Sequence, residues 1–144
     1  MGFEGRPENK DVEFQAAMDI LLEMRGASSI NEELQGLFDD VRFSIARYNQ
    51  TIARLNHIER RMKRNADVSN DEIQNADEAR RRAHDALMDN LNILSRGFAK
   101  HGLDNHWRKL IGLDAREQVT EWAVHVGEFL AKEKEAQKDK EVSQ

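Results

Sequence analysis

One stretch of the chain carries polar side chains whose spacing could do chemistry. Asp85, Asp89, Asn92 and Arg96 recur at intervals of four, three and four residues, and His84 directly precedes the first of them. On a helix this spacing brings the four side chains to one face. Two carboxylates one turn apart could bind a divalent cation or share a proton. The sequence therefore leaves two interpretations of these five residues, a ligand-binding site and a solvated polar surface.

Metal and cofactor chemistry has little support elsewhere in the sequence. The five histidines are scattered, and the Glu-x-x-His pairs of carboxylate-bridged di-metal bundles are missing. Glu121 and His125 lie one turn apart, which provides half a metal site. The absence of cysteine excludes Cys-ligated zinc, a thiolate nucleophile and a disulfide framework. We expect no cofactor and no metal site; Asp85 and Asp89 are the residues that would bind a metal ion if one is held.

A second arrangement points to RNA cleavage. Arg96 and His101 are separated by four residues, a spacing that resembles that of the helical RNase domains of toxin–antitoxin systems. The resemblance would imply metal-independent cleavage by the arginine and the histidine at a dimer interface. Gly97 follows the arginine where those domains prefer a polar residue, and His101 falls at a predicted helix end. Arg96 and His101 are therefore the catalytic candidates of an alternative function.

The elements that position these residues are predicted to be helices in one domain. The 144 residues include one proline, and no segment alternates apolar and polar residues as a strand would. Ser29, Ser69 and Asp114 each precede a Glu by three residues, as in a capping box. Gly26, Gly102 and Gly112 stand where left-handed residues would end helices. The predicted helices span residues 8–25, 30–66, 70–101, 105–111 and 115–135, with flexible tails at 1–7 and 136–144.

The two longest helices define the architecture. Apolar residues in 30–66 recur every three or four positions, interrupted only at Glu59, which is typical of a seam against a partner helix; they are Leu34, Phe38, Val41, Ile45, Tyr48, Ile52, Leu55 and Met62. Helices 30–66 and 70–101 would be about 55 and 48 Å long, and the outer ones about 27 and 31 Å. A three-residue link forces the long helices to be antiparallel. The predicted fold is an all-α, up-down helical bundle built on a long antiparallel hairpin whose tip projects.

Charge is distributed unevenly along this hairpin. The chain has a net charge of −5, yet residues 42–82 hold 10 basic and 6 acidic side chains. Folding the hairpin about residue 68 would pair most of this charge across the two helices, each exposed pair contributing about 0–1 kcal/mol. The predicted pairs are Arg60 and Arg61 with Asp77 and Glu78, Arg64 with Asp71 and Glu72, Arg47 with Asp85 and Asp89, and Arg96 with Asp39 and Asp40.

The remaining cations form a basic patch of Arg54, His57, Arg80, Arg81 and Arg82. This patch could contact an acidic partner or a phosphate backbone. The acidic net charge and the near absence of aromatic residues in the region disfavour nucleic-acid binding. The sequence keeps a nucleic-acid-binding protein as an alternative, using the basic arms of the hairpin.

Part of the sequence is similar to a known family. The run from Arg82 to Arg96 (RAHDALMDNLNILSR), followed by Trp107-Arg108, Arg116 and Trp122-Ala123, resembles a family of small, all-helical bacterial proteins without known function. The resemblance covers about residues 80–125. It implies a bacterial source and supplies no activity, cofactor or catalytic residue.

Together these features favour a non-enzymatic interaction or regulatory module in the cytoplasm. No apolar run approaches the roughly 20 residues that a bilayer span requires. Leu55, Ile58 and Met62 lie beyond the reach of the outer helices, so a second hairpin would bury their apolar area. The sequence therefore predicts a homodimer through the long hairpin, with a further protein partner as an option. A metal-dependent or RNase-like enzyme is the other alternative.

Overall fold

The structure, a computed structural model, describes residues 5–143, with side chains for residues 12–115 and 118–138. The described chain forms five helices and no strand, and these are α1 (Gly5–Ser28), α2 (Glu32–Lys63), α3 (Asn70–Lys100), α4 (Trp107–Leu110) and α5 (Arg116–Ser143). The predicted all-α fold is confirmed. Residues 1–4 and 144, parts of the predicted tails, lie outside the described residues, whereas residues 5–7 and 136–143 are helical.

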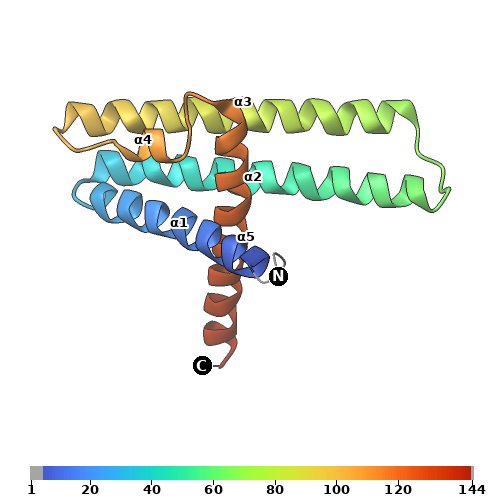
Figure 1. The fold of residues 1–144 in the computed structure, drawn as a ribbon, viewed down its shortest axis with the longest axis horizontal. Coiled ribbons are helices and arrows are strands. Elements are labelled where there is room, and N and C mark those ends of the chain that lie inside the picture. The colour runs from blue at the N-terminus through green and yellow to red at the C-terminus, as the bar shows by residue number, and fades with distance from the viewer. Residues whose placement is uncertain (1–4, 144) are drawn as a thin grey trace.

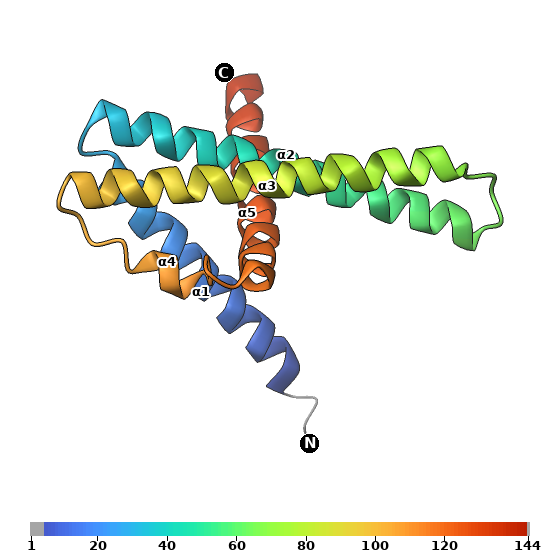
Figure 2. The ribbon, with the colours of Figure 1, turned by 90° about the horizontal axis from the view of Figure 1, so that it is seen from above.

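Helices α2 and α3 run antiparallel along the longest axis of the molecule (Figure 1). Their 32 and 31 residues give lengths of about 48 and 47 Å. Helix α1 packs against the N-terminal half of α2, and α5 crosses the hairpin near its middle at a steep angle (Figures 1 and 2). The other half of the hairpin projects beyond α1 and α5, as predicted.

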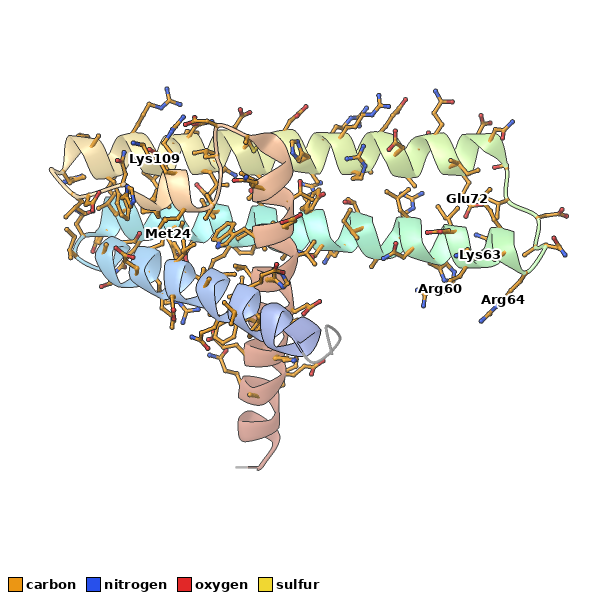
Figure 3. All side chains as sticks on the ribbon, viewed as in Figure 1. Met24, Arg60, Lys63, Arg64, Glu72 and Lys109 are labelled. Atoms are coloured by element: carbon orange, nitrogen blue, oxygen red, sulfur yellow. The ribbon has the colours of Figure 1, made fainter. Side chains whose placement is uncertain are left out.

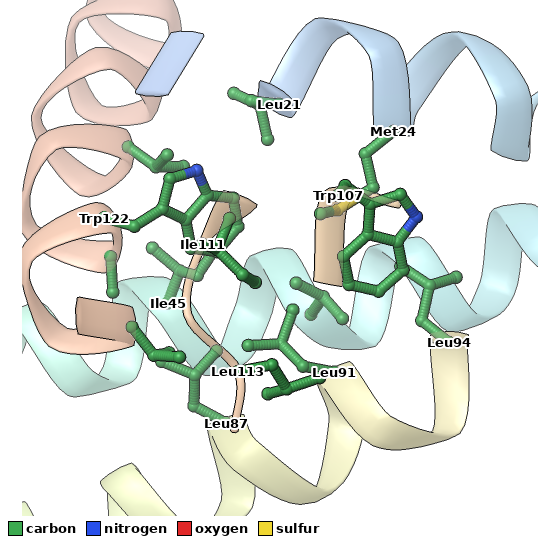
Figure 4. Close-up of a cluster of buried hydrophobic side chains, with 14 of the residues drawn as sticks. Leu21, Met24, Ile45, Leu87, Leu91, Leu94, Trp107, Ile111, Leu113 and Trp122 are labelled. Carbon is green, nitrogen blue, oxygen red and sulfur yellow. The ribbon is translucent and has the colours of Figure 1, made fainter. Parts of the chain in front are cut away.

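The core lies where α1, α4 and α5 meet the base of the hairpin (Figure 4). Trp122 of α5 is 4% exposed, and its indole N–H donates to the backbone oxygen of Ala17 in α1 (3.3 Å). Trp107 of α4 packs edge-on against Phe98 of α3, with 5.5 Å between the ring centroids. Burial of both tryptophans fixes the short α4 segment and α5 to the hairpin.

Polar side chains surround the projecting half of the hairpin (Figure 3). Arg60 and Arg64 point away from α3, whereas Glu72 lies between the two helices. Among the described residues, no helix is both long enough and apolar enough to cross a bilayer.

Two of the three predicted helix starts can be compared with the observed caps. Ser69 caps α3 by accepting a hydrogen bond from the Glu72 N–H (3.1 Å). Helix α2 is capped by Asn31, whose Oδ1 accepts from the Leu34 N–H (2.8 Å), so the predicted start at Ser29 is wrong by two residues. The Asn31 side chain reaches the orphan N–H that a capping residue must satisfy. The Glu117 side chain of the third start lies outside the described side chains.

The predicted helix ends are confirmed at two glycines and wrong at the third. Gly102 and Gly112 both have φ of +69° and follow the ends of α3 and α4. Gly26 lies inside α1, which continues to Ser28. Gly26 is not among the described glycines with positive φ, which are Gly102 and Gly112, so it continues the helix instead of ending it.

Helix α2 ends three residues earlier than predicted, at Lys63, because Asn65 takes the left-handed conformation (φ 58°). The Ala66 N–H donates to the Arg61 oxygen (3.0 Å), and the Asn65 N–H donates to the Met62 oxygen (3.1 Å). These are the two hydrogen bonds of a Schellman motif. The link between α2 and α3 therefore spans residues 64–69.

The earlier turn changes the register of the hairpin. Side chains that meet across it include Arg61 with Glu72 and Ser44 with Asn90, and their midpoints lie near residue 67 instead of 68. Moving the centre by one residue moves each facing partner by about two. None of the predicted cross-helix ion pairs forms among the described residues; the pairs predicted were Arg60 and Arg61 with Asp77 and Glu78, Arg64 with Asp71 and Glu72, Arg47 with Asp85 and Asp89, and Arg96 with Asp39 and Asp40.

The register also changes the argument for a dimer at the tip. Ile58 is only 3% exposed and Leu55 is half-buried, whereas Met62 is 52% exposed. The expectation that all three need a second hairpin is therefore wrong for Ile58, which the single chain already buries.

Candidate functional site

The predicted polar face of α3 does not form one site. The His84 ring is mostly buried and lies against Tyr48 of α2, with 6.1 Å between ring centroids. Its Nδ1 lies 3.6 Å from an Asp85 oxygen, but the Asp85 side chain is 70% exposed. Asp89 and Arg96 are also exposed. Within the described residues, no three His, Cys, Asp or Glu side chains lie close enough together to hold a metal ion.

Asn92, the fourth member of that face, is engaged in structural contacts. Its amide donates to the Met88 oxygen (3.0 Å), and its Oδ1 accepts from Arg108 Nη1 (2.9 Å). The Nη2 of Arg108 donates to Asp114 Oδ1 (2.8 Å). Arg108 thus links α3 to the segment that leads into α5. The sequence interpretation missed this role, because only the folded chain brings position 108 near position 92.

The catalytic candidates Arg96 and His101 have different surroundings. Arg96 is exposed and makes no ion pair in the described part of the chain. The His101 ring lies 2.9 Å from Glu33 at the start of α2, and Lys100 donates to the same carboxylate (3.1 Å). The hydrogen bonds from His101 and Lys100 lower the pKa of Glu33. His101 therefore joins the two ends of the hairpin at its base.

The basic patch is partly neutralised. Arg80 and Arg81 both bind Asp77 of the same helix, at 3.1 and 3.0 Å. Arg54, His57 and Arg82 are exposed, and the described residues offer them no ion pair. These three basic residues, which lie on α2 and α3, therefore remain available to an acidic ligand.

A hollow lies elsewhere, where α5 crosses α2. Asn49 of α2 donates to the Ala123 oxygen of α5 (3.0 Å), and a Cβ on Gly127 would collide with the Asn49 side chain. Small residues thus allow the two helices to touch at their crossing. Beyond this point they diverge and leave a groove of about 540 Å³.

The groove is mostly apolar and borders an exposed aromatic ring. Ala46 and Ala53 of α2 face Leu130 and Ala131 of α5 across it. Phe43 lines the same groove and is 74% exposed, the most exposed large hydrophobic residue among the described side chains. We define the interaction face as this groove together with Phe43.

Two charged residues that line the groove, Arg42 and Glu133, are paired within the chain, whereas Lys134 has no ion pair among the described residues. Arg42 binds Asp39 on its own helix, and its guanidinium carbon lies 5.9 Å from the Phe38 ring centroid. Glu133 of α5 binds Arg25 of α1 (3.3 Å). The apolar lining and the Lys134 ammonium are therefore the parts of the groove that remain without a partner in the described chain.

The sequence contained one signal for this face. Phe43 is a large apolar residue that falls off the seam formed by Val41 and Ile45. The groove itself had no signal, because its existence depends on the steep crossing of α5.

Comparison with models of protein families, with curated proteins and with solved structures finds no match for this chain. The resemblance of residues 80–125 to an uncharacterised bacterial family stays an expectation from the sequence.

Proposed function

We propose that the protein is a non-enzymatic interaction module that self-associates through the interaction face of α2 and α5. The observation that carries this proposal is Phe43, which stands 74% exposed beside an apolar groove of about 540 Å³. The cytoplasmic location and the bacterial source belong to the same proposal and rest on the sequence alone.

The physical reason is the cost of leaving this surface in water. Burying one phenylalanine side chain contributes about 1.5–3 kcal/mol, and a two-fold dimer would bury two. Aromatic anchors beside hollows lined by small residues are common at the centres of protein interfaces. The self-complementary contact of two identical copies is the commonest way to close such a surface.

The residues that the sequence marked as catalytic or metal-binding candidates do not form a reactive site. Asn92 and His101 are held by contacts within the chain, and Asp85 and Asp89 point into solvent without a third ligand in the described structure. A catalytic site needs groups that converge on one reacting atom. No such convergence supports the enzymatic alternatives.

The proposal is tested by light scattering with size-exclusion chromatography over a range of concentrations. We expect a mass of twice 16.6 kDa for the wild type, and a dimer dissociation constant raised by about 100-fold or more in Phe43→Ala. The matched control is Met62→Ala, which removes an exposed apolar side chain at the hairpin tip. A monomeric wild type, or dissociation by Met62→Ala but not by Phe43→Ala, would refute the proposal.

Nucleic-acid binding at the hairpin tip is the second candidate, favoured by the exposed and unpaired Arg54, His57 and Arg82. It predicts a complex with duplex DNA or RNA at low salt whose affinity falls steeply as salt increases. An unchanged electrophoretic mobility of both nucleic acids at low ionic strength would exclude it. The double substitution of Arg54 and Arg82 by Ala should abolish binding, if binding is seen.

A further inference from the structure

The outward face of α2 carries a second stripe with three- and four-residue spacing. Its members are all exposed, and the stripe passes through Phe43 at its centre: Glu33, Gly36, Asp40, Phe43, Arg47, Gln50 and Arg54. This periodicity is that of a seam between paired helices. The inner seam of α2 is already covered by α3, so the outer stripe, apart from Glu33 at its start, is a helix face without an ion-pair partner in the described chain.

Charge along this stripe changes sign at Phe43. Asp40 lies one turn before the ring and Arg47 one turn after it, while Glu33 and Arg54 repeat the same order further out. In an antiparallel pair of α2 helices related by a two-fold axis close to Phe43, Asp40 faces Arg47 and Glu33 faces Arg54. A parallel pair would instead place Asp40 against Asp40 and Arg47 against Arg47, which is repulsive.

The inner two charges are available for such a contact. Asp40 and Arg47 are exposed, and neither forms an ion pair with any other described residue. Glu33 differs, because Lys100 and His101 already bind it. The pair of Asp40 with Arg47 is therefore the stronger determinant of orientation.

We infer that a second copy of this chain packs on the outer stripe, α2 against α2 and antiparallel, with Asp40 of one copy facing Arg47 of the other across Phe43. This inference rests on the proposed self-association and specifies its orientation and register. It joins the charge pattern of α2 to the neighbouring groove, which Phe43 and Gln50 of the stripe also line.

The surroundings of the stripe suit a second helix. Gly36 has no atom within 4 Å of an added Cβ, so the backbone is open to close approach there. Ala46 and Ala53 lie beside the stripe and lead into the groove, where Leu130 of α5 offers further apolar contact. A helix on the stripe would therefore touch both α2 and α5.

The arrangement has a measurable consequence for the two hairpin tips. Lys63, the last residue of α2, lies about 30 Å along the helix from the proposed axis. In the antiparallel dimer the two tips point in opposite directions, and the two Lys63 positions are separated by about 60 Å. A parallel dimer would bring them side by side.

Charge reversal tests the facing residues. Asp40→Arg and Arg47→Asp each convert two attractive contacts of the dimer into repulsive ones, and we expect each to raise the dimer dissociation constant by about tenfold. The double variant Asp40→Arg/Arg47→Asp restores opposite charges and should return the constant to within about threefold of the wild type. The control is Asp89→Arg, an exposed carboxylate of α3, which should leave the constant unchanged.

Distance measurement tests the orientation without changing the stripe. The chain has no cysteine, so Lys63→Cys gives one spin label per copy in an otherwise native dimer. Double electron–electron resonance should report a distance of about 60 Å. Circular dichroism of each variant should match the wild type, since every substituted side chain is exposed.

The outcomes separate the two proposals. A wild type that is monomeric overturns both. A dimer dissociated by Phe43→Ala, but with a short label distance or without rescue in the double variant, leaves self-association intact and overturns the antiparallel register. Rescue together with the long distance supports the inference.

Discussion

The side-chain amide of Asn49 on α2 donates a hydrogen bond to the backbone oxygen of Ala123 on α5, with 3.0 Å between the two atoms. The same nitrogen lies 2.9 Å from the Ile45 oxygen of its own helix. This side chain therefore ties α5 to α2 where the two helices cross (Figure 1). The divergence of the helices beyond it creates the groove next to Phe43.

The crossing predicts a strong dependence on Gly127. Gly127→Ala places a methyl group against the Asn49 side chain, and we expect the free energy of unfolding to fall by about 1–3 kcal/mol. In an Asn49→Ala background the collision is removed, and the same substitution should stabilise by up to about 1 kcal/mol through helix propensity. Urea denaturation of the wild type, the two single variants and the double variant measures both effects. If Gly127→Ala changes the free energy of unfolding equally in both backgrounds, Gly127 does not lie against the Asn49 side chain.

Gly26 should respond in the opposite direction. It lies inside α1 with open space around it, so Gly26→Ala should raise the free energy of unfolding by about 0.5–1 kcal/mol. The matched control is Gly102→Ala, where φ of +69° makes the same change destabilising. Loss of stability in Gly26→Ala would show that α1 ends at residue 25, with Gly26 left-handed, as the sequence alone predicted.

The hairpin could be predicted because its determinants are local. The apolar seam of α2 and the Ser69 cap stand within a few residues of the structure that they specify. The register was wrong because it depended on where α2 ends, and the left-handed Asn65 ends it before Ala66. Even in the observed register Arg47 lies opposite the stretch between Asp85 and Asp89. All three side chains are exposed and form no ion pair with one another, so the change in the turn does not explain the absence of this pair.

The candidate site could not be predicted in the same way. Gly127 and Ala123 appear in the sequence as ordinary small residues of a helix, and the angle at which α5 crosses α2 has no local signature. Polar residues on one helix face were also ambiguous, because Asn92 acquires its role only from Arg108 in another element. Residue types identified candidates, whereas tertiary packing decided their roles.

The contact between Glu33 and His101 predicts an acid-dependent loss of stability. Hydrogen bonds from His101 and Lys100 lower the Glu33 pKa below its ordinary value of 4.5, so the folded state binds this proton less readily than the unfolded chain. The stabilisation is present above pH 4.5 and is lost as the pH falls through the lowered pKa.

Urea denaturation should show Glu33→Gln to be less stable than the wild type at pH 7, with the difference shrinking below pH 4. A difference that persists unchanged at pH 3 would contradict the assignment. Glu32→Gln, one residue earlier and exposed, is the control.

The stability of the fold should depend on the guanidinium group of Arg108 and not only on its positive charge. Its guanidinium donates to Asn92 on α3 and to Asp114 before α5, at 2.9 and 2.8 Å, a fork that a lysine ammonium cannot reproduce. We expect Arg108→Ala to lower the free energy of unfolding by about 1–3 kcal/mol, because the half-buried Asn92 oxygen loses its partner.

Arg108→Lys should recover less than half of that loss, while Lys109→Ala, an exposed neighbour, should stay within about 0.5 kcal/mol of the wild type. Chemical denaturation gives the three values. Full recovery by lysine would show that charge alone is needed at this position, and that the two directed hydrogen bonds do not hold the α3–α5 connection.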